Sequence, residues 1–254
     1  MDLAGFDFTA LLPFIAVGFA AQLVDGALGM AFGVITNTLM VAVLGVPPAT
    51  ASQRVHLVEC FTTATSGISH LLHGNIDKRL FFRLLIPGLA GGVLGAYLLA
   101  SIDAALIKPF VLAYLAAIGV WLLVRGILYP PTLKEAKFVS PLGFVGGFLD
   151  AAGGGGWGPV VTSNLLIQGA DPRKVVGTVN SVEFFLTLTI SAAFIYHLGV
   201  ADVAGATLGL LIGGVAAAPI GAWAAKVIPP KPMLIMVGIV LSLTSAYGIW
   251  TALS

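Results

Sequence analysis

The stretch Asp150-Ala-Ala-Gly-Gly-Gly-Gly-Trp-Gly-Pro159 organises the rest of the chain. It lies inside a long apolar run and holds four consecutive glycines, each of which costs a helix interior about 1 kcal/mol relative to alanine. The run therefore predicts a break in a helix. In a membrane, broken backbone is tolerated only where protein buries it or where it lines a cavity. A charged Asp150 beside the break adds to the cost, so we expect a functional site here.

A weaker copy of this stretch, Asp25-Gly-Ala-Leu-Gly-Met-Ala-Phe-Gly33, lies in the first half of the chain. Asp25 and Asp150 are 125 positions apart, and other residues recur at nearly the same distance. The pairs, 124 to 126 positions apart, are Gly18 and Gly143, Gly33 and Gly158, Gly45 and Gly169, Pro48 and Pro172, Glu59 and Glu183, His73 and His197, Gly88 and Gly214, and Gly95 and Gly221. We therefore divide the chain into two repeats, residues 1–130 and 138–254.

Composition places the chain in a membrane. Of its 254 residues 58% are hydrophobic and 9% are charged, whereas a soluble domain carries roughly 25% charged residues. The net charge of +1 gives no reason to expect nucleic acid as a partner, and the single cysteine, Cys60, excludes an intrachain disulfide. No signal peptide is expected, because Asp2 and Asp7 precede the first apolar run and no Lys or Arg does.

The apolar segments fall into two classes by length. Two of them, 10–44 and 139–168, are too long for one span of about 20 residues and contain the two breaks. We expect each to form a re-entrant helical hairpin with the break at its tip. In the second hairpin, arms of about 11 residues would rise about 16 Å, roughly half of the membrane core. The segments expected to be single transmembrane helices are 49–73, 80–101, 105–128, 174–198, 203–225 and 233–252.

The basic residues predict that the two repeats have opposite orientations. Positively charged junctions stay on the inner side of a membrane. The basic junctions hold Lys78, Arg79 and Arg83; Arg125, Lys134 and Lys137; Arg173 and Lys174; and Lys226 and Lys231. Matching junctions of the two halves differ in charge, which indicates an inverted repeat with both termini outside. Eight simple spans in parallel repeats are the alternative, which would scatter the basic junctions over both faces.

The two hairpin tips are the predicted substrate site. Exposed backbone N–H groups and the positive N-terminal ends of the outgoing arms would bind an anion near the middle of the membrane. The alternative is that the glycines only allow helices to pack closely. The acids that open the tips, Asp25 and Asp150, would cap backbone N–H groups or bind a coupling cation. The tip residues taken as substrate-binding are Asp25, Gly26, Gly29, Gly153, Gly154, Gly155, Gly156 and Trp157.

A polar stripe runs along the second segment of each half. Its residues are Ser52, His56, Glu59, Thr63, Ser66 and His70 in the first half, and Asn180, Glu183, Thr187 and Ser191 in the second. Their helical spacing puts each set on one face, toward the bundle interior. We expect His56 and Asn180 to contact substrate. Glu59 and Glu183 are read as coupling residues, either proton carriers or protonated structural donors. Hydrogen bonding between helices is the alternative for the Ser and Thr positions.

Arg54 is the one basic residue well inside an apolar segment. It lies two positions before His56, roughly 160° around the helix, and is therefore off the stripe. Three roles are open for it: pairing with the substrate anion, holding a carboxylate such as Asp25, or extending to the membrane surface.

The paired tips resemble the TauE/SafE family of sulfite and organosulfonate exporters. The resemblance rests on Gly18-Phe-x5-Asp25-Gly-Ala-Leu-Gly-Met-Ala-Phe-Gly33, on Gly143-Phe-x5-Asp150-x2-Gly-Gly-Gly-Gly156, and on Ala49-Thr-Ala-Ser-Gln-Arg54, and covers nearly the whole chain. It implies export of a small sulfur-containing anion, such as sulfite or sulfoacetate, across the inner membrane of a bacterium.

The predicted function is therefore secondary transport, because the sequence has no ATP-binding motif. A channel, or a transporter of another small organic anion, is the alternative. We expect no enzyme activity, cofactor or metal, since no nucleophile–base pair or ligand set has convincing spacing. The partners expected are the anionic substrate and the lipid bilayer, with a homodimer left open.

Overall fold

In the computed structural model, residues 8–40, 44–98, 104–128, 133–153, 156–198 and 205–253 are described, and these residues form helices and connecting loops without strands. The helices are α1 (Phe8–Leu28), α2 (Phe32–Thr38), α3 (Pro48–Leu72), α4 (Lys78–Leu98), α5 (Ala104–Leu128), α6 (Val139–Gly153), α7 (Trp157–Gln168), α8 (Pro172–Leu198), α9 (Ala206–Val227) and α10 (Pro230–Leu253). The six helices expected as single spans end within three residues of the predicted bounds.

Both long segments break where the sequence predicted. The first breaks between α1 and α2, where Gly29 and Ala31 have φ of +73° and +106°. Glycine adopts this left-handed conformation at little cost, whereas alanine is strained in it. The second breaks between α6 and α7. The arms differ in length: α1 has 21 residues and α2 only 7, while α6 and α7 have 15 and 12.

Helices α6 and α7 form a helical hairpin whose open ends meet. The side-chain Oε1 of Gln168, at the end of α7, accepts hydrogen bonds from the backbone N–H groups of Lys137 and Phe138, just before α6. The backbone N–H of Lys134 also donates to the carbonyl of Gly169 at 2.7 Å. The chain therefore leaves this hairpin at the end where it came in.

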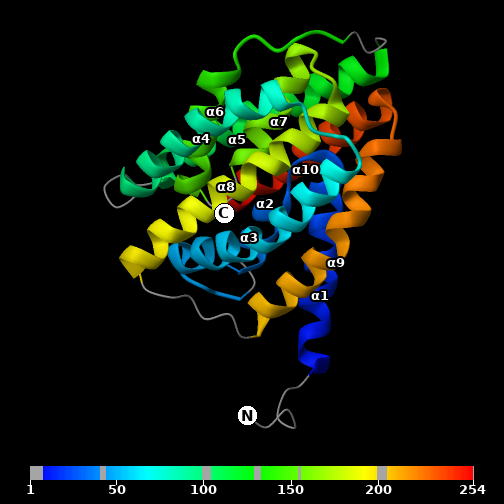
Figure 1. Cartoon of the computed structure of the whole chain (residues 1–254). Helices are drawn as coiled ribbons and strands as arrows, with labels where there is room; N and C mark the ends of the chain where they lie inside the picture. Colours follow the sequence, from blue (N-terminus) through cyan, green and yellow to red (C-terminus); the bar gives the residue numbers. More distant parts are fainter. Residues whose placement is uncertain are drawn as a thin grey trace.

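Glycines allow the broken helices to pack tightly against whole ones. Helix α1 lies along α9, and α6 lies along α4 (Figure 1). A Cβ atom on Gly213 of α9 would lie 2.0 Å from the Ile15 carbonyl oxygen, and one on Gly91 of α4 would lie 2.0 Å from that of Phe144. Such close backbone contacts are typical of helix packing in membranes.

Helices α3 and α8 cross at the centre of the molecule in antiparallel directions (Figure 1). Near one end of the contact Ser66 Oγ donates to Asn180 Oδ1 at 3.0 Å, and further along Cys60 Sγ lies 3.4 Å from Ser191 Oγ. Helices α5 and α10 form a second antiparallel pair, in which Gly119 faces Ser242 and Gly126 faces Ile235. In both pairs, a helix from the first half of the chain therefore runs antiparallel to one from the second half.

Basic side chains form hydrogen bonds that connect three of the loops between helices. Arg173 and Lys174 donate to carbonyl oxygens just after α3, those of His73 and Gly74, at 2.8 and 2.9 Å. Arg83 of α4 donates to the carbonyl of Lys137 at 3.0 Å. The loops before α4, α6 and α8 are thus side by side.

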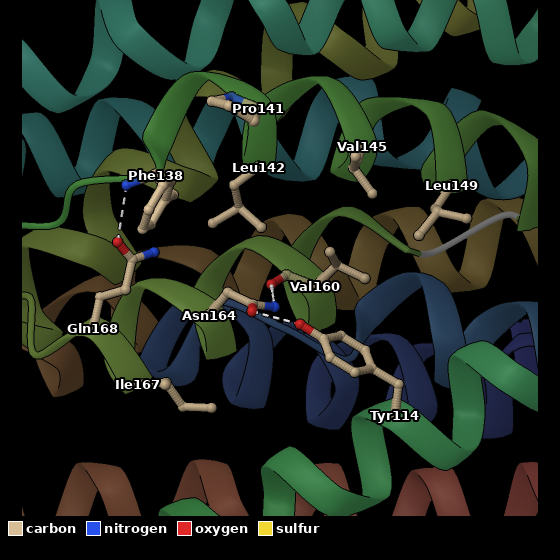
Figure 2. Close-up of a pocket in the computed structure, with 10 residues that line it drawn as sticks. All are labelled: Tyr114, Phe138, Pro141, Leu142, Val145, Leu149, Val160, Asn164, Ile167 and Gln168. Carbon is tan, nitrogen blue, oxygen red and sulfur yellow. Dashed lines mark hydrogen bonds between the residues drawn. The ribbon is translucent and has the colours of Figure 1, made fainter.

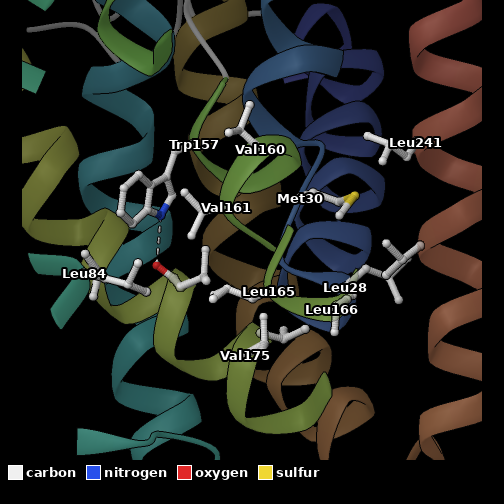
Figure 3. Close-up of a cluster of buried hydrophobic side chains, with 14 of the residues drawn as sticks. Leu28, Met30, Leu84, Trp157, Val160, Val161, Leu165, Leu166, Val175 and Leu241 are labelled. Carbon is white, nitrogen blue, oxygen red and sulfur yellow. Dashed lines mark hydrogen bonds between the residues drawn. The ribbon is translucent and has the colours of Figure 1, made fainter. Parts of the chain in front are cut away.

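Within the described residues, five helices are long and apolar enough to cross a membrane: those of α1, α4, α8, α9 and α10. Their outer surfaces carry large apolar side chains, such as Ile86 and Trp250, which are 70% and 65% exposed. An apolar surface of this kind suits the hydrocarbon core of a bilayer. Beneath it, Trp157, Leu84 and Val161 belong to one buried apolar cluster (Figure 3).

Candidate functional site

The two tips meet inside the molecule. Thr162 Oγ1 of α7 donates to the carbonyl oxygen of Gly29 in the first tip, at 2.7 Å. A Cβ atom on Gly158 would lie 2.7 Å from the same oxygen, so only glycine fits there at the present spacing. The first tip therefore rests directly on the first turn of α7.

Asp150 caps the helix that leaves the second tip. Its Oδ1 accepts a hydrogen bond from the backbone N–H of Trp157, the first residue of α7, at 3.0 Å. This is the capping geometry considered for Asp150, with the carboxylate near the positive end of the helix. Asp25, its counterpart at the end of α1, lies beside the backbone N–H of Phe32, the first residue of α2, and beside Gln22. Both carboxyl groups are almost fully buried.

His56 of α3 faces Asp150. The imidazole Nε2 lies 3.5 Å from Asp150 Oδ2, and neither side chain is more than 2% exposed. On the other side of the ring, Nδ1 lies 2.8 Å from the Ser52 carbonyl oxygen. A carbonyl oxygen can only accept, so Nδ1 carries a hydrogen. This fixes which ring nitrogen turns toward Asp150.

Two further acids complete a buried polar centre. Glu59 of α3 interacts electrostatically with His56, Asp150 and Asp25. Glu183 of α8 interacts with Asp25, Glu59 and Asp150. The Oε2 atoms of Glu59 and Glu183 are buried and have no hydrogen-bond partner within the described part of the chain. Among the described residues, no three His, Cys, Asp or Glu side chains come close enough to hold a metal ion.

Both polar stripes point inward. All ten stripe residues are buried, and Asn180 of α8 uses its amide fully: Nδ2 donates to the carbonyls of Asp25 and Val176, both at 3.3 Å, and Oδ1 accepts from Ser66. Asn180 thus ties α8 to the end of α1 and to α3. This is the hydrogen bonding between helices that was considered for the Ser and Thr positions.

Arg54 stands apart from the buried acids. No described carboxylate lies within ion-pair distance of its guanidinium, and its buried Nε has no hydrogen-bond partner among the described residues either. The residue is half-buried. Of the three roles considered, holding Asp25 has no support in this conformation, while pairing with a substrate anion and extending to the surface both remain predictions.

The other predicted tip residues have varied surroundings. Trp157 is fully buried, and its indole N–H donates to the Val179 carbonyl at 3.2 Å (Figure 3). Gly26 lies against Gly221 of α9, and Gly156 directly precedes α7 with its backbone against Leu149. Gly153 ends α6, and the predicted substrate-binding Gly154 and Gly155 lie outside the described residues.

A separate groove opens between the hairpin arms and α5. It has a volume of about 600 Å³. Its wall is mostly apolar, and its polar contacts include the hydrogen bond from Tyr114 Oη to Asn164 Oδ1, at 2.6 Å (Figure 2). His56 and the four buried acids are absent from its lining. The groove is therefore separate from the polar centre.

Two contacts that define the centre were not predicted from the sequence. The pairing of His56 with Asp150 joins residues 94 positions apart, and that of Thr162 with Gly29 joins residues 133 apart. The sequence does place polar residues on both arms, since Asn37 and Thr38 have Thr162 and Ser163 as counterparts at a spacing of 125. Without a register between the halves, neither contact could be assigned.

Apolar helices surrounding a buried polar centre define a multi-pass membrane transporter, and comparison with known proteins agrees. Residues 14–248 match the family described as "Sulfite exporter TauE/SafE". The chain belongs to this family. A "probable membrane transporter protein YtnM" of Bacillus subtilis is 42% identical over 245 residues, covering 93% of this chain and 81% of that protein. A "probable membrane transporter protein" of Haemophilus influenzae is 27% identical over 224 residues, covering 84% and 86%.

Proposed function

We propose that this protein is a secondary transporter that exports a small sulfur-containing anion, such as sulfite or an organosulfonate, from a bacterial cell across its inner membrane. The observation that carries the proposal is the meeting of two helix breaks at a buried polar centre. Buried polar atoms without partners are costly, and proteins keep few of them. Here the Oε2 atoms of Glu59 and Glu183 and the Nε of Arg54 are such atoms, all within the second segments of the two halves.

Pairs of contacts support the inverted repeat. Gly18 of α1 touches Leu210 of α9, and the residues 125 and 126 positions away, Gly143 of α6 and Leu84 of α4, also touch. Likewise, Gly26 touches Gly221, and the residues 125 and 126 positions away, Ala151 and Gly95, also touch. Since matching helices α3 and α8 run antiparallel, a two-fold axis across them would relate the halves. In a membrane such an axis lies in the bilayer plane.

The meeting ends of α6 and α7 support a re-entrant hairpin at the inner face. The junctions expected inside are those joined by Arg83, Arg173 and Lys174 at one end of the molecule. The 15 and 12 residues of α6 and α7 correspond to rises of about 22 and 18 Å, less than the ~30 Å membrane core. For the first half, the 20 apolar residues of α1 are long enough to cross, so its hairpin would be strongly unequal.

An acidic centre limits how an anion could bind. Four carboxyl groups and one imidazole, from Asp25, Glu59, Asp150, Glu183 and His56, share the buried region. Several carboxylates cannot all be charged so close together in a poorly solvated place. An anion bound at the tips would therefore travel with protons, which supports coupling to a proton gradient. The first turn of α7 and the Arg54 guanidinium are the attractive elements for the anion.

Counterflow in proteoliposomes tests the function. Vesicles loaded with sulfite should take up labelled sulfite in a saturable way, which a channel would not do. A thermal-shift screen of the purified protein against sulfite, thiosulfate, sulfoacetate and taurine would identify the preferred anion. Sulfite flux that rises linearly with concentration would favour the channel. If acetate is added to the screen, stabilisation by acetate and by none of the four sulfur compounds would favour a transporter of another organic anion.

Proton coupling gives a sharper prediction. Glu59→Gln and Glu183→Gln should each weaken sulfite transport driven by a pH gradient by about tenfold, because the amide cannot release a proton. Counterflow should be largely spared, since it needs no net proton movement. Thr187→Ser, a conservative change on the same stripe as Glu183, is the control. Unchanged dependence on the pH gradient in both glutamine variants would contradict the coupling role.

A further inference from the structure

We infer that His56 and Asp150 together form a one-proton site that controls the α6–α7 tip. The inference deepens the proposed transport function, on which it rests for the importance of the tip. It assigns the proton to a pair of side chains from two different elements, α3 and α6, whereas the sequence pattern pointed only to the two glutamates.

Hydrogen bonding restricts the protonation states of the pair. Because Nδ1 of His56 donates to the Ser52 carbonyl, Nε2 is either a bare lone pair or an N–H. Nε2 and Asp150 Oδ2 face each other at 3.5 Å, and neither atom has another hydrogen-bond partner among the residues that the structure describes. A bare Nε2 facing a carboxylate would bury two acceptors against each other, which is unfavourable. One proton between them removes the conflict.

The same proton can lie on either partner. Imidazolium with carboxylate and neutral imidazole with carboxylic acid both give the pair zero net charge. When the proton leaves, through the neighbouring Glu59 or to water, Nε2 keeps its lone pair and Asp150 stays a carboxylate. The charge of the pair then changes from 0 to −1, and no covalent bond between heavy atoms is formed or broken.

Asp150 transmits this change to the tip. Its other oxygen, Oδ1, holds the backbone N–H of Trp157 at the start of α7, and its own backbone belongs to the last turn of α6. Loss of the proton makes Oδ2 and Nε2 repel, so the carboxylate has to turn or withdraw. Either movement disturbs the cap on α7. The first two turns of α7 also carry the contacts of Gly158 and Thr162 with Gly29, so the disturbance reaches the other tip.

The second half of the protein lacks this device. The position 124 residues after His56 is Asn180, which cannot titrate. Its amide donates to the backbone carbonyl of Asp25 and stays uncharged at any pH. Two similar tips are thus held differently: one by a permanent hydrogen bond and one by a contact that depends on a proton. Because of that difference, only the α6–α7 tip would respond to protonation of the residue that contacts it.

The titratable groups around the pair are few. Glu59 comes from α3 itself, Asp25 from α1 and Glu183 from α8, and all three interact with the pair or with each other. His70, also buried on α3, differs in kind. Its Nδ1 accepts from Asn75 Nδ2 at 3.0 Å, because the Asn75 Oδ1 atom already accepts from Arg173. His70 therefore serves as a matched control histidine.

The test needs no substrate. In protein labelled with ¹⁵N-histidine, ring nitrogen shifts report which of the four histidines carries which hydrogen. His56 should keep its Nδ1 hydrogen throughout a titration from about pH 5 to pH 10, and its Nε2 should change in one step. Trp157 fluorescence should change in the same step. The other tryptophans, Trp121, Trp223 and Trp250, are more than half exposed and would be replaced by Phe.

Three variants decide the outcome. His56→Asn, which copies the second half, should abolish the fluorescence step, while His70→Asn should retain it. Asp150→Asn should also abolish the step, because its amide can donate to Nε2 and still accept from Trp157. It thereby mimics the protonated pair without a proton, and it tests the proposal even if His56→Asn does not fold. A His56 Nε2 whose shift never changes over the titration, or a shift step that leaves Trp157 fluorescence unaltered, would overturn the inference. Failure of sulfite transport would remove the link between this proton site and transport, whereas the shift and fluorescence measurements decide whether the site itself exists.

Discussion

At the scale of single residues, the buried centre brings together polar groups that would each be unfavourable to bury without a partner. Asp150 satisfies a helix end with one oxygen and faces His56 with the other, so one side chain links a cap to a titratable partner. Asp25 has a similar place beside the start of α2 but meets an amide, Asn180, through its backbone carbonyl. Matching positions therefore carry unlike chemistry.

Arg54 gives the prediction that belongs to this scale. A guanidinium can meet two oxygens of a sulfonate or sulfite as a fork, whereas lysine offers only a point charge. If Arg54 binds the substrate, Arg54→Ala should weaken sulfite binding by about 2–5 kcal/mol and Arg54→Lys by part of that. Calorimetry on the purified protein measures both.

The control for Arg54 is Arg79→Ala, because the Arg79 side chain is 75% exposed and pairs with the exposed Glu135 at 3.8 Å. It should leave sulfite affinity unchanged, since exposed pairs contribute little. Affinity of folded Arg54→Ala within about twofold of the parent protein would mean that Arg54 extends to the membrane surface and does not reach the substrate.

At the scale of elements, glycine decides where helices break and how closely they approach. The glycine-rich stretch before Trp157 ends α6, while in the first copy the helix continues to Leu28 and turns only at Gly29. The contact between Gly29 and Gly158 then sets the spacing of the tips. The breaks are therefore part of the packing as well as of the proposed site.

Gly158→Ala tests that spacing. Its new methyl group would lie 2.7 Å from the Gly29 carbonyl oxygen, closer than the backbone allows, so the tips must separate. Overpacking of this kind typically costs about 1–3 kcal/mol. We expect sulfite counterflow to fall at least tenfold, with a smaller effect on the thermal midpoint.

Gly67→Ala is the matched control for Gly158→Ala. A Cβ atom there would meet Ser181 Cα at 3.4 Å, near ordinary contact distance, and alanine favours a helix interior. Its transport should be close to that of the parent protein. Normal counterflow by Gly158→Ala would show that the tip spacing is not essential.

Much of the arrangement of the helices could be predicted from the sequence, because helix breaks and buried helix faces depend on local residue chemistry. The two breaks follow from glycine, and the inward faces of α3 and α8 follow from polar residues at helical spacing, all of which are buried. The length of α1 was less predictable, since one glycine at position 26 does not stop a helix that packs along α9. The partners of His56 and Thr162 depend on how distant helices meet, which periodicity does not contain.

At the scale of the whole molecule, helices from both halves of the chain surround one centre. The parallel packing of α1 with α9 has a counterpart in that of α6 with α4, and each pair combines helices from different halves. Neither half can therefore bury its broken helix alone. Each broken helix is therefore held by a helix from the other half of the chain. We expect a movement of one half to shift the tip that packs against it.

The last prediction concerns how these halves lie across the membrane. Single cysteines at positions 7, 134 and 202 would be introduced into a Cys60→Ser background, since Cys60 is the only native cysteine. A membrane-impermeant thiol reagent applied to intact cells should label positions 7 and 202 but not 134. The reason is that Lys134 is hydrogen-bonded to Gly169 within the group of basic junctions, which the positive-inside rule puts in the cytoplasm. Opening the cells with detergent should make position 134 reactive, because Lys134 is exposed in the structure. External labelling at 134 would reject the inverted topology, and with it the proposal that α6 and α7 enter the membrane from inside.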